Sequence, residues 1–196
     1  MNDSSHFSRS PELMSRHDTA LAVIDVQQKL IPLIPGHERI IWNIRRLIDG
    51  AKLLGLPLLA TEQYPQGLGG TVPELAARLN DIAAKVAFSS CGCEEFCEQL
   101  AAADTPKVLL AGIEAHVCVQ QTALDLIANG YRVYVAVDAL GSRNETDYET
   151  ALRRMELAGV TLTTIEAALF EWCRESSTPE FKQISALVRE TPPAGE

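Results

Sequence analysis

The sequence predicts an α/β protein: a three-layer α/β/α sandwich around a six-stranded parallel sheet with strand order 3-2-1-4-5-6. The first observation behind this is that short, continuously apolar runs alternate with longer segments of helical spacing along the 196 residues. Continuous apolar runs are typical of parallel strands that are covered by helices on both faces. The second is that no internal repeat or low-complexity linker divides the chain. Because crossovers between parallel strands are right-handed, a doubly wound arrangement is favoured.

The first half of the chain supplies three of the expected strands. In residues 38–55, apolar side chains recur at helical spacing until Gly55, which ends the helix. Residues 62–71 contain a proline and three glycines, which predicts a loop, and Pro73 is a favoured helix start. The expected strands are 19–26, 56–61 and 84–89, and the expected helices are 38–55, 73–79 and 93–103.

The second half continues the alternation. Gly130 and Gly159 each close a helix, and a break near Pro179 divides the last helical segment into two pieces. The expected strands are 106–113, 131–139 and 160–165, and the expected helices are 119–130, 144–159 and two within 166–190. We therefore expect an N-terminal arm over residues 1–17, one domain over residues 18–190 and a tail over residues 191–196.

Composition and charge exclude several classes of protein. The formal net charge of −9 argues against a nucleic-acid-binding surface. No apolar stretch approaches the ~18 residues of a membrane span, and the N-terminus lacks the apolar core of a secretory signal. We therefore expect a cytoplasmic protein that binds neither membranes nor nucleic acid.

The five cysteines favour reduced thiols. Their odd number, without a secretion signal, is typical of a reducing compartment. Cys91 and Cys93 form the one close pair, but they match no zinc-binding spacing. Redox pairing and inert packing both remain open for this pair.

Two chemically capable residues fall at the carboxyl edge of the expected sheet. Asp25 ends the first strand, and Cys118 lies just past the fourth, near a strand-to-helix turn. In the predicted order these strands are neighbours at the point where strand order reverses, which is where ligands bind in open parallel sheets. Lys85 lies beside the short third strand, but the sequence alone does not place it in the same cleft.

Each of these residues, taken singly, also has a purely structural explanation. A cysteine in an apolar stretch more often fills a core, an aspartate often caps a turn, and a lysine is usually a solvated surface charge. Together they could supply a nucleophile (Cys118), a proton acceptor (Asp25) and a cation that balances the charge of the carboxylate (Lys85).

Several motifs resemble the isochorismatase-like cysteine hydrolases across roughly residues 18–170. They are "VIDVQ" (23–27), a lysine followed by "VAFS" (85–89), "GIEAHVCV" (112–119) and "NETDYETALRRMELAGV" (144–160). The stretch "EQYPQGLGGTVPEL" (62–75) is similar to a loop of the subgroup called isochorismatase domain-containing proteins.

The resemblance implies the predicted fold and a catalytic triad of Asp25, Lys85 and Cys118. It also implies a cis peptide bond between Ile113 and Glu114, with the backbone amides of Glu114 and Cys118 forming an oxyanion hole. Members of the family that this chain resembles usually self-associate. The resemblance therefore implies a homo-oligomer, and we expect its interface to be formed by the late helices 145–158 and 166–173.

The chain also departs from the metal-binding branch of that family. The nicotinamidases bind a metal through histidines in the loop after the second strand, whereas this chain has no histidine between residues 61 and 84. We therefore expect no metal and no cofactor. Family enzymes that cleave the vinyl ether of isochorismate do not need the cysteine, so Cys118 favours acyl chemistry on a small amide, imide or related carbonyl compound.

Four residues are candidates for substrate binding because they lie beside the triad segments or in the glycine-rich loop: Gln27, Tyr64, Leu68 and Phe88. Rim packing explains them equally well. His116 precedes the cysteine by two residues, a spacing at which helical side chains diverge, so we do not expect it to be the catalytic base. Arg143 and Asn144 face the same cleft or cap the following helix. A thiol-redox sensor and a non-catalytic homo-oligomer that keeps the pocket are the alternatives to a hydrolase.

Overall fold

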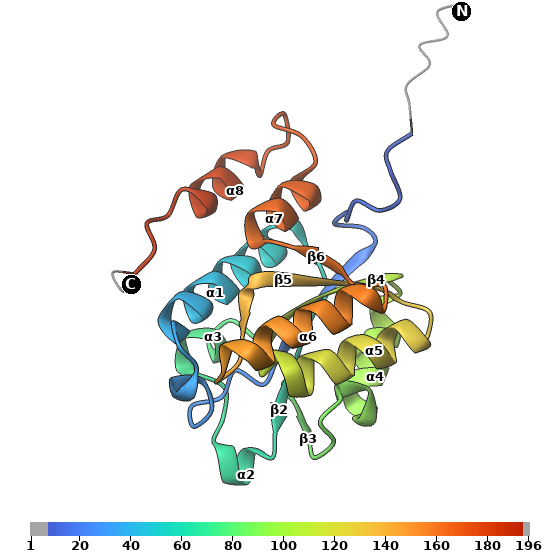
Figure 1. Ribbon diagram of the computed structural model, residues 1–196. Coiled ribbons are helices and arrows are strands. Elements are labelled where there is room, and N and C mark those ends of the chain that lie inside the picture. The colour runs from blue at the N-terminus through green and yellow to red at the C-terminus, as the bar shows by residue number, and fades with distance from the viewer. Residues whose placement is uncertain (1–7, 194–196) are drawn as a thin grey trace, which may run out of the picture.

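The computed structural model describes residues 8–193 and has the predicted architecture (Figure 1). All strand pairs in the six-stranded sheet are parallel, and the order is β3-β2-β1-β4-β5-β6. The strands are β1 (Thr19–Ile24), β2 (Leu58–Gln63), β3 (Ala83–Lys85), β4 (Lys107–Ile113), β5 (Arg132–Gly141) and β6 (Thr161–Thr163).

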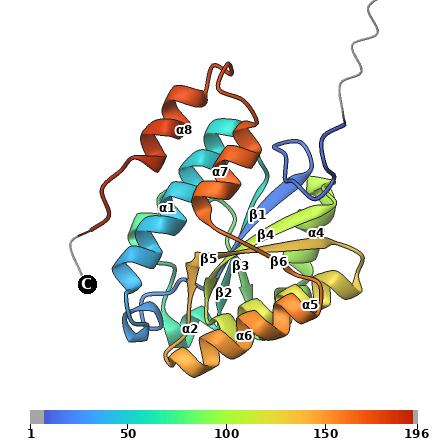
Figure 2. The same ribbon diagram turned by 45° about the horizontal axis from the view of Figure 1, so that its top comes forward.

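Helices cover both faces of the sheet (Figure 2). The helices on one face are α1 (His37–Leu54), α3 (Pro73–Ala76), α7 (Ile165–Cys173) and α8 (Phe181–Val188). Those on the other are α4 (Glu94–Ala103), α5 (Gln120–Ala128) and α6 (Glu145–Leu157). Each layer encloses its own cluster of buried apolar side chains, as expected when a sheet is apolar on both faces.

The second strand differs from its sequence-based prediction of 56–61. β2 begins and ends two residues later, and its last three residues, Thr61, Glu62 and Gln63, are polar. The apolar pattern ends at Ala60, but Thr61 and Gln63 remain buried because their side chains have hydrogen-bond partners. The polar end of this strand therefore forms part of the candidate site.

Four further segments also differ from the predictions. β3 has three residues rather than the six of 84–89, because the chain turns away after Lys85. The predicted loop 62–71 contains the short helix α2 (Pro65–Leu68). Two single-turn helices, η1 (Ile31–Leu33) and η2 (Ser90–Gly92), were not predicted because they are too short to show a helical apolar pattern.

Gly112 allows β1 and β4 to approach closely at the edge that carries the site. Its φ is +130°, and a Cβ at this position would lie 2.1 Å from the carbonyl oxygen of Ile24. Both the backbone conformation and the contact exclude a side chain. The glycine thus brings the end of β4 against the end of β1, where Asp25 follows.

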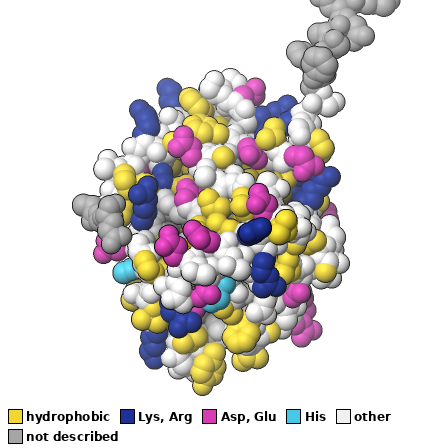
Figure 3. Space-filling model, viewed as in Figure 1, with side chains coloured by type: hydrophobic (Ala, Val, Ile, Leu, Met, Phe, Trp, Pro, Cys, Tyr) yellow, Lys and Arg dark blue, Asp and Glu magenta, His cyan; other side chains and the backbone are white. Residues whose placement is uncertain are grey.

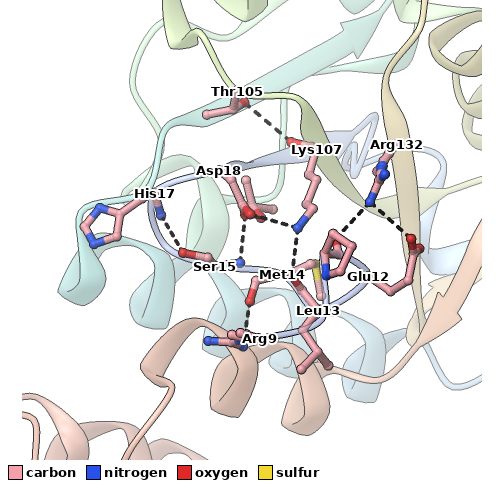
Figure 4. Close-up of polar contacts among 12 residues, drawn as sticks. Arg9, Glu12, Leu13, Met14, Ser15, His17, Asp18, Thr105, Lys107 and Arg132 are labelled. Carbon is pink, nitrogen blue, oxygen red and sulfur yellow. Dashed lines mark hydrogen bonds and ion pairs between the residues drawn. The ribbon is translucent and has the colours of Figure 1, made fainter. Parts of the chain in front are cut away.

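The described part of the N-terminal arm is fastened to the opposite edge of the sheet (Figure 4). The buried ammonium of Lys107 donates to the carbonyl oxygen of Leu13 at 2.7 Å and to Asp18 Oδ2 at 2.8 Å. Met14 is fully buried in the core. Residues 8–17 therefore pack on the domain, while residues 1–7 and 194–196 lie outside the described part.

Within residues 8–193, none of the helices combines the length and the apolar character needed to cross a lipid bilayer.

Candidate active site

Asp25 lies immediately past β1 at the carboxyl edge of the sheet. It is fully buried and has a φ of 53°, a left-handed conformation that few residues other than glycine adopt. Thr61 Oγ1 donates to Asp25 Oδ1 at 2.8 Å, and Lys85 Nζ lies 2.7 Å from Asp25 Oδ2. Both carboxylate oxygens are therefore held by a charged or a polar donor, and the side chain of Asp25 has no exposed surface in the resting protein.

Lys85, the last residue of β3, forms a completely buried ion pair with Asp25. Its ammonium also lies 2.8 Å from Gln63 Oε1, and the carbonyl oxygens of Ala87 and Phe88 are at 3.2 and 3.0 Å. These partners offset the loss of hydration that a buried ammonium suffers. The structure thus brings Lys85 against Asp25, which the sequence alone did not require.

Cys118 lies in η3 (Ala115–Val119), a π-helical turn between β4 and α5. Its side chain is buried, and the residue is 6% exposed. Burial, followed by the negative charge of Asp25, raises the pKa of the Cys118 thiol to about 12, while the positive charge of Lys85 lowers it. The three residues of the expected triad are therefore close enough to act on one another, and the resting thiol is protonated at neutral pH.

This protonation state predicts an unusual pH dependence for alkylation of Cys118 by iodoacetamide. With a pKa of about 12, only about 10⁻⁴ of the Cys118 thiol is ionised near pH 8. The rate of alkylation is therefore expected to rise about tenfold per pH unit through about pH 10. Asp25→Asn removes a negative charge, lowers the thiol pKa and speeds alkylation at about pH 8.

Peptide mapping distinguishes Cys118 from the exposed Cys97 in this experiment. A rate that levels off below about pH 9, or one that does not respond to Asp25→Asn, would contradict the placement of the thiol beside the carboxylate.

The turn before the cysteine is tied to the loop after β5. Glu114 Oε2 accepts hydrogen bonds from the backbone N and the Nε of Arg143, both at 3.0 Å. His116 Nδ1 lies 3.0 Å from Ser142 Oγ, so this ring contacts the loop rather than acting as a base at Cys118. The Ile113–Glu114 peptide bond is cis, as the resemblance implies.

Gln27 lies at the site but has no free polar group to offer a substrate. It is fully buried, its Nε2 donates to the carbonyl oxygens of Gln63 and Gly69, and its Oε1 accepts from the backbone N of Gln63. The expectation that Gln27 binds substrate therefore gives way to a supporting role. It fastens the glycine-rich loop to β2.

The other three predicted binding residues lie around the site. Tyr64 and Phe88 are exposed, and Leu68 is half-buried in α2. The backbone N of Tyr64 donates to the carbonyl oxygen of Lys85 at 2.8 Å, which places Tyr64 next to the backbone of Lys85. Asn144 is exposed and donates to Asp147 Oδ2, at the start of α6.

Thr61 and Gln63 are site residues that the sequence analysis missed. They donate to Asp25 and lie against Lys85, respectively. The signal was their spacing of two at the end of an apolar strand, which puts both side chains on one face of the sheet.

The described residues 8–193 contain no group of three or more histidine, cysteine, aspartate or glutamate side chains positioned to hold a metal ion. All five cysteines are free thiols.

Comparison with known proteins identifies relatives over most of the chain. A family model described as "Isochorismatase domain" matches residues 19–167. The mouse "Isochorismatase domain-containing protein 2A" is 39% identical over 173 residues, covering 88% of this chain and 84% of that protein. The zebrafish (Danio rerio) "Isochorismatase domain-containing protein 2" is 36% identical over 180 residues, with 92% and 91% covered.

Two solved structures share the fold. The "MAR1 Ribonuclease" of Caenorhabditis elegans superimposes with a TM-score of 0.87 at 41% identity, covering 92% of this chain and 94% of that chain. The YcaC gene product of Escherichia coli, described as an octameric hydrolase of unknown specificity, superimposes with a TM-score of 0.83 at 28% identity, with 92% and 91% covered.

Proposed function

Since this chain belongs to the isochorismatase family, we propose that it is a metal-independent cysteine hydrolase that forms an acyl-enzyme at Cys118. Its substrate is a small amide, imide or related carbonyl compound. The observation that carries this proposal is the buried Asp25–Lys85 ion pair, whose two charges both act on the Cys118 thiol. A core-filling cysteine has no need of a buried base and a buried cation beside it.

The proposed reaction begins with the protonated thiol. Asp25 accepts the proton from Cys118 Sγ as the sulfur attacks the substrate carbonyl carbon, so no free thiolate accumulates beside the carboxylate. The backbone amides of Glu114 and Cys118 stabilise the negative oxygen of the tetrahedral intermediate. Asp25 then gives the proton to the leaving nitrogen, and the C–N bond breaks to leave a thioester.

Hydrolysis of the thioester completes the cycle. Asp25 takes a proton from water, the resulting hydroxide attacks the thioester carbonyl, and the departing sulfur recovers the proton from Asp25. Lys85 stays charged throughout and holds Asp25 through the contact at 2.7 Å. Its role is to keep the carboxylate in place and to balance its charge.

RNA cleavage is a second candidate because the 41% identical structure from Caenorhabditis elegans is named a ribonuclease. The net charge of −9 disfavours it, since a phosphate backbone is attracted by basic surfaces. The two activities can be separated experimentally.

The test is a substrate panel of small primary amides, cyclic imides such as succinimide, and a labelled single-stranded RNA. We expect release of ammonia from an amide or ring opening of an imide, with the RNA left intact. RNA cleavage that is lost in Asp25→Asn, without turnover of any amide or imide, would contradict the proposal and establish the ribonuclease.

A further inference from the structure

Thr122, in α5, joins two segments of the candidate site through one side-chain hydroxyl. Its Oγ1 donates to the carbonyl oxygen of Cys118 at 2.7 Å and accepts a hydrogen bond from the backbone N of Ser90 at 2.9 Å. Both Thr122 and Ser90 are fully buried. In Figure 3, charged and hydrophobic side chains are interspersed over the surface, and this contact lies beneath them.

The Ser90 end of this link belongs to the segment that holds Lys85. The carbonyl oxygens of Ala87 and Phe88 lie 3.2 and 3.0 Å from Lys85 Nζ. The turn η2 begins at Ser90, and the hydroxyl of Ser89 caps it. A shift of Ser90 would therefore move the carbonyl groups that position the lysine ammonium.

The other end of the link is the carbonyl group of the proposed nucleophile itself. Cys118 lies in the π-helical turn η3, and α5 begins two residues later, at Gln120. The backbone amide of Cys118 is one of the two proposed donors to the oxyanion. Because the sulfur, the amide and the carbonyl belong to one residue, the contact with Thr122 constrains the positions of all three.

This link has no substitute among the hydrogen bonds of the described residues. Between residues 86–93 and residues 114–128, the Ser90–Thr122 contact is the one hydrogen bond found there. A threonine that donates to a carbonyl four residues earlier is common in helices, but the bond from Ser90 spans 32 positions. Since both groups are buried, loss of the hydroxyl would leave the N–H of Ser90 without a partner.

We propose that Thr122 is a positioning residue that keeps the Cys118 sulfur beside the Asp25–Lys85 ion pair. This role rests on the proposed function, because it concerns the same reaction. Small displacements of a reacting group lower the rate strongly, so Thr122 acts on the attack through the placement of Cys118. Valine resembles threonine in shape and lacks the hydroxyl, so a residue that only filled the core would be replaced by valine with a loss of stability alone.

The first measurement needs no substrate and follows alkylation of Cys118 by iodoacetamide at about pH 8. Asp25→Asn is expected to accelerate this reaction in the wild-type background, because the carboxylate charge acts on the thiol. In the Thr122→Val background the acceleration is expected to be smaller by about threefold or more, because the sulfur is no longer held beside residue 25. Thr122→Ser, which keeps the hydroxyl, should restore it.

Thr19→Val is the matched control. Thr19 is also fully buried and its Oγ1 donates to Asp18 Oδ1 at 2.8 Å, but it begins β1, at the opposite edge of the sheet. This variant is expected to lose stability in thermal unfolding and to keep the full acceleration by Asp25→Asn. Thr122→Ala, which removes the hydroxyl and places no methyl group against Ser90, takes the place of Thr122→Val if the valine variant fails to fold.

Turnover of the best amide or imide substrate is the second measurement. Thr122→Val is expected to lower kcat by about tenfold or more with a smaller change in KM, because positioning rather than substrate binding is lost. A kcat that changes no more in Thr122→Val than in Thr19→Val would overturn the proposal.

The alkylation experiment can also overturn it. An undiminished acceleration by Asp25→Asn in the Thr122→Val background would make Thr122 a structural residue. An Asp25→Asn variant without any acceleration in the wild-type background would leave no coupling for Thr122 to maintain. If wild type hydrolysed no amide or imide while Thr122→Val still weakened the coupling, the proposed hydrolase would be wrong and the placement of Cys118 by Thr122 would be supported.

Discussion

Replacing Cys118 by alanine is expected to lower hydrolysis of the best amide or imide substrate by about 10³-fold or more. The change removes the only atom that forms the proposed covalent bond, while the buried ion pair of Asp25 and Lys85 stays in place. The free energy of unfolding should change little, because alanine fits the small space of a cysteine side chain. Steady-state turnover and thermal unfolding of the same preparation measure the two effects.

Cys93→Ala is the matched control for that substitution. Cys93 is 8% exposed and Cys118 6%, and both belong to the same buried apolar cluster. The Cys93 variant is expected to keep wild-type turnover. If both variants retained full activity, Cys118 would be a packing residue and the acyl-enzyme mechanism would be wrong.

Lys85→Met is expected to lower the free energy of unfolding by about 3–5 kcal/mol. Methionine fills the space of the lysine stem but leaves the Asp25 carboxylate buried without its cation. The loss is therefore the cost of an uncompensated charge rather than of a cavity. Chemical denaturation at neutral pH measures it.

Two further variants assign the cause of that loss. Lys107→Met also removes a buried ammonium, but its partner Asp18 is 32% exposed and can be solvated, so a smaller loss is expected. The double variant Lys85→Met with Asp25→Asn should recover part of the stability, because neither charge then remains. A Lys85→Met loss below about 1 kcal/mol would show that the pair is not buried as described.

The sequence was sufficient to predict the sheet, because its apolar strands are continuous and its helices are amphipathic. The same reasoning brought Asp25 and Cys118 together, since β1 and β4 are neighbours at their carboxyl ends. The end of β2 was harder to predict from the sequence, because Thr61 and Gln63 are polar and interrupt the apolar pattern. Their side chains are hydrogen-bonded to residues that are distant in the sequence.

Lys85 and Gln27 show two different limits of sequence reasoning. Lys85 entered the triad through the family resemblance, because a lysine beside a short strand has no pattern that marks it as buried. Gln27 was expected to face the substrate, yet its amide is used to hold the glycine-rich loop. Both outcomes depend on contacts across more than 30 positions of sequence, which no local pattern records.

The high pKa of the Cys118 thiol is consistent with the proposal that Asp25 removes the thiol proton only while the sulfur attacks the substrate carbonyl. A thiolate beside Asp25 would place two negative charges in one buried site, which is unfavourable until a carbonyl carbon is present to accept the sulfur. In the mechanism that we propose, the sulfur becomes nucleophilic through proton transfer to Asp25 rather than as a permanently ionised thiolate.

The most direct test of the central claim is to locate the acyl group after brief treatment with p-nitrophenyl acetate, by mass spectrometry of the intact protein and its peptides. We expect one acetyl group on the buried Cys118, none on the exposed Cys97, and no intact-mass change in Cys118→Ala. If the most exposed cysteine reacted first, so that Cys97 were acetylated and Cys118 were not, the proposed acyl-enzyme at Cys118 would be contradicted.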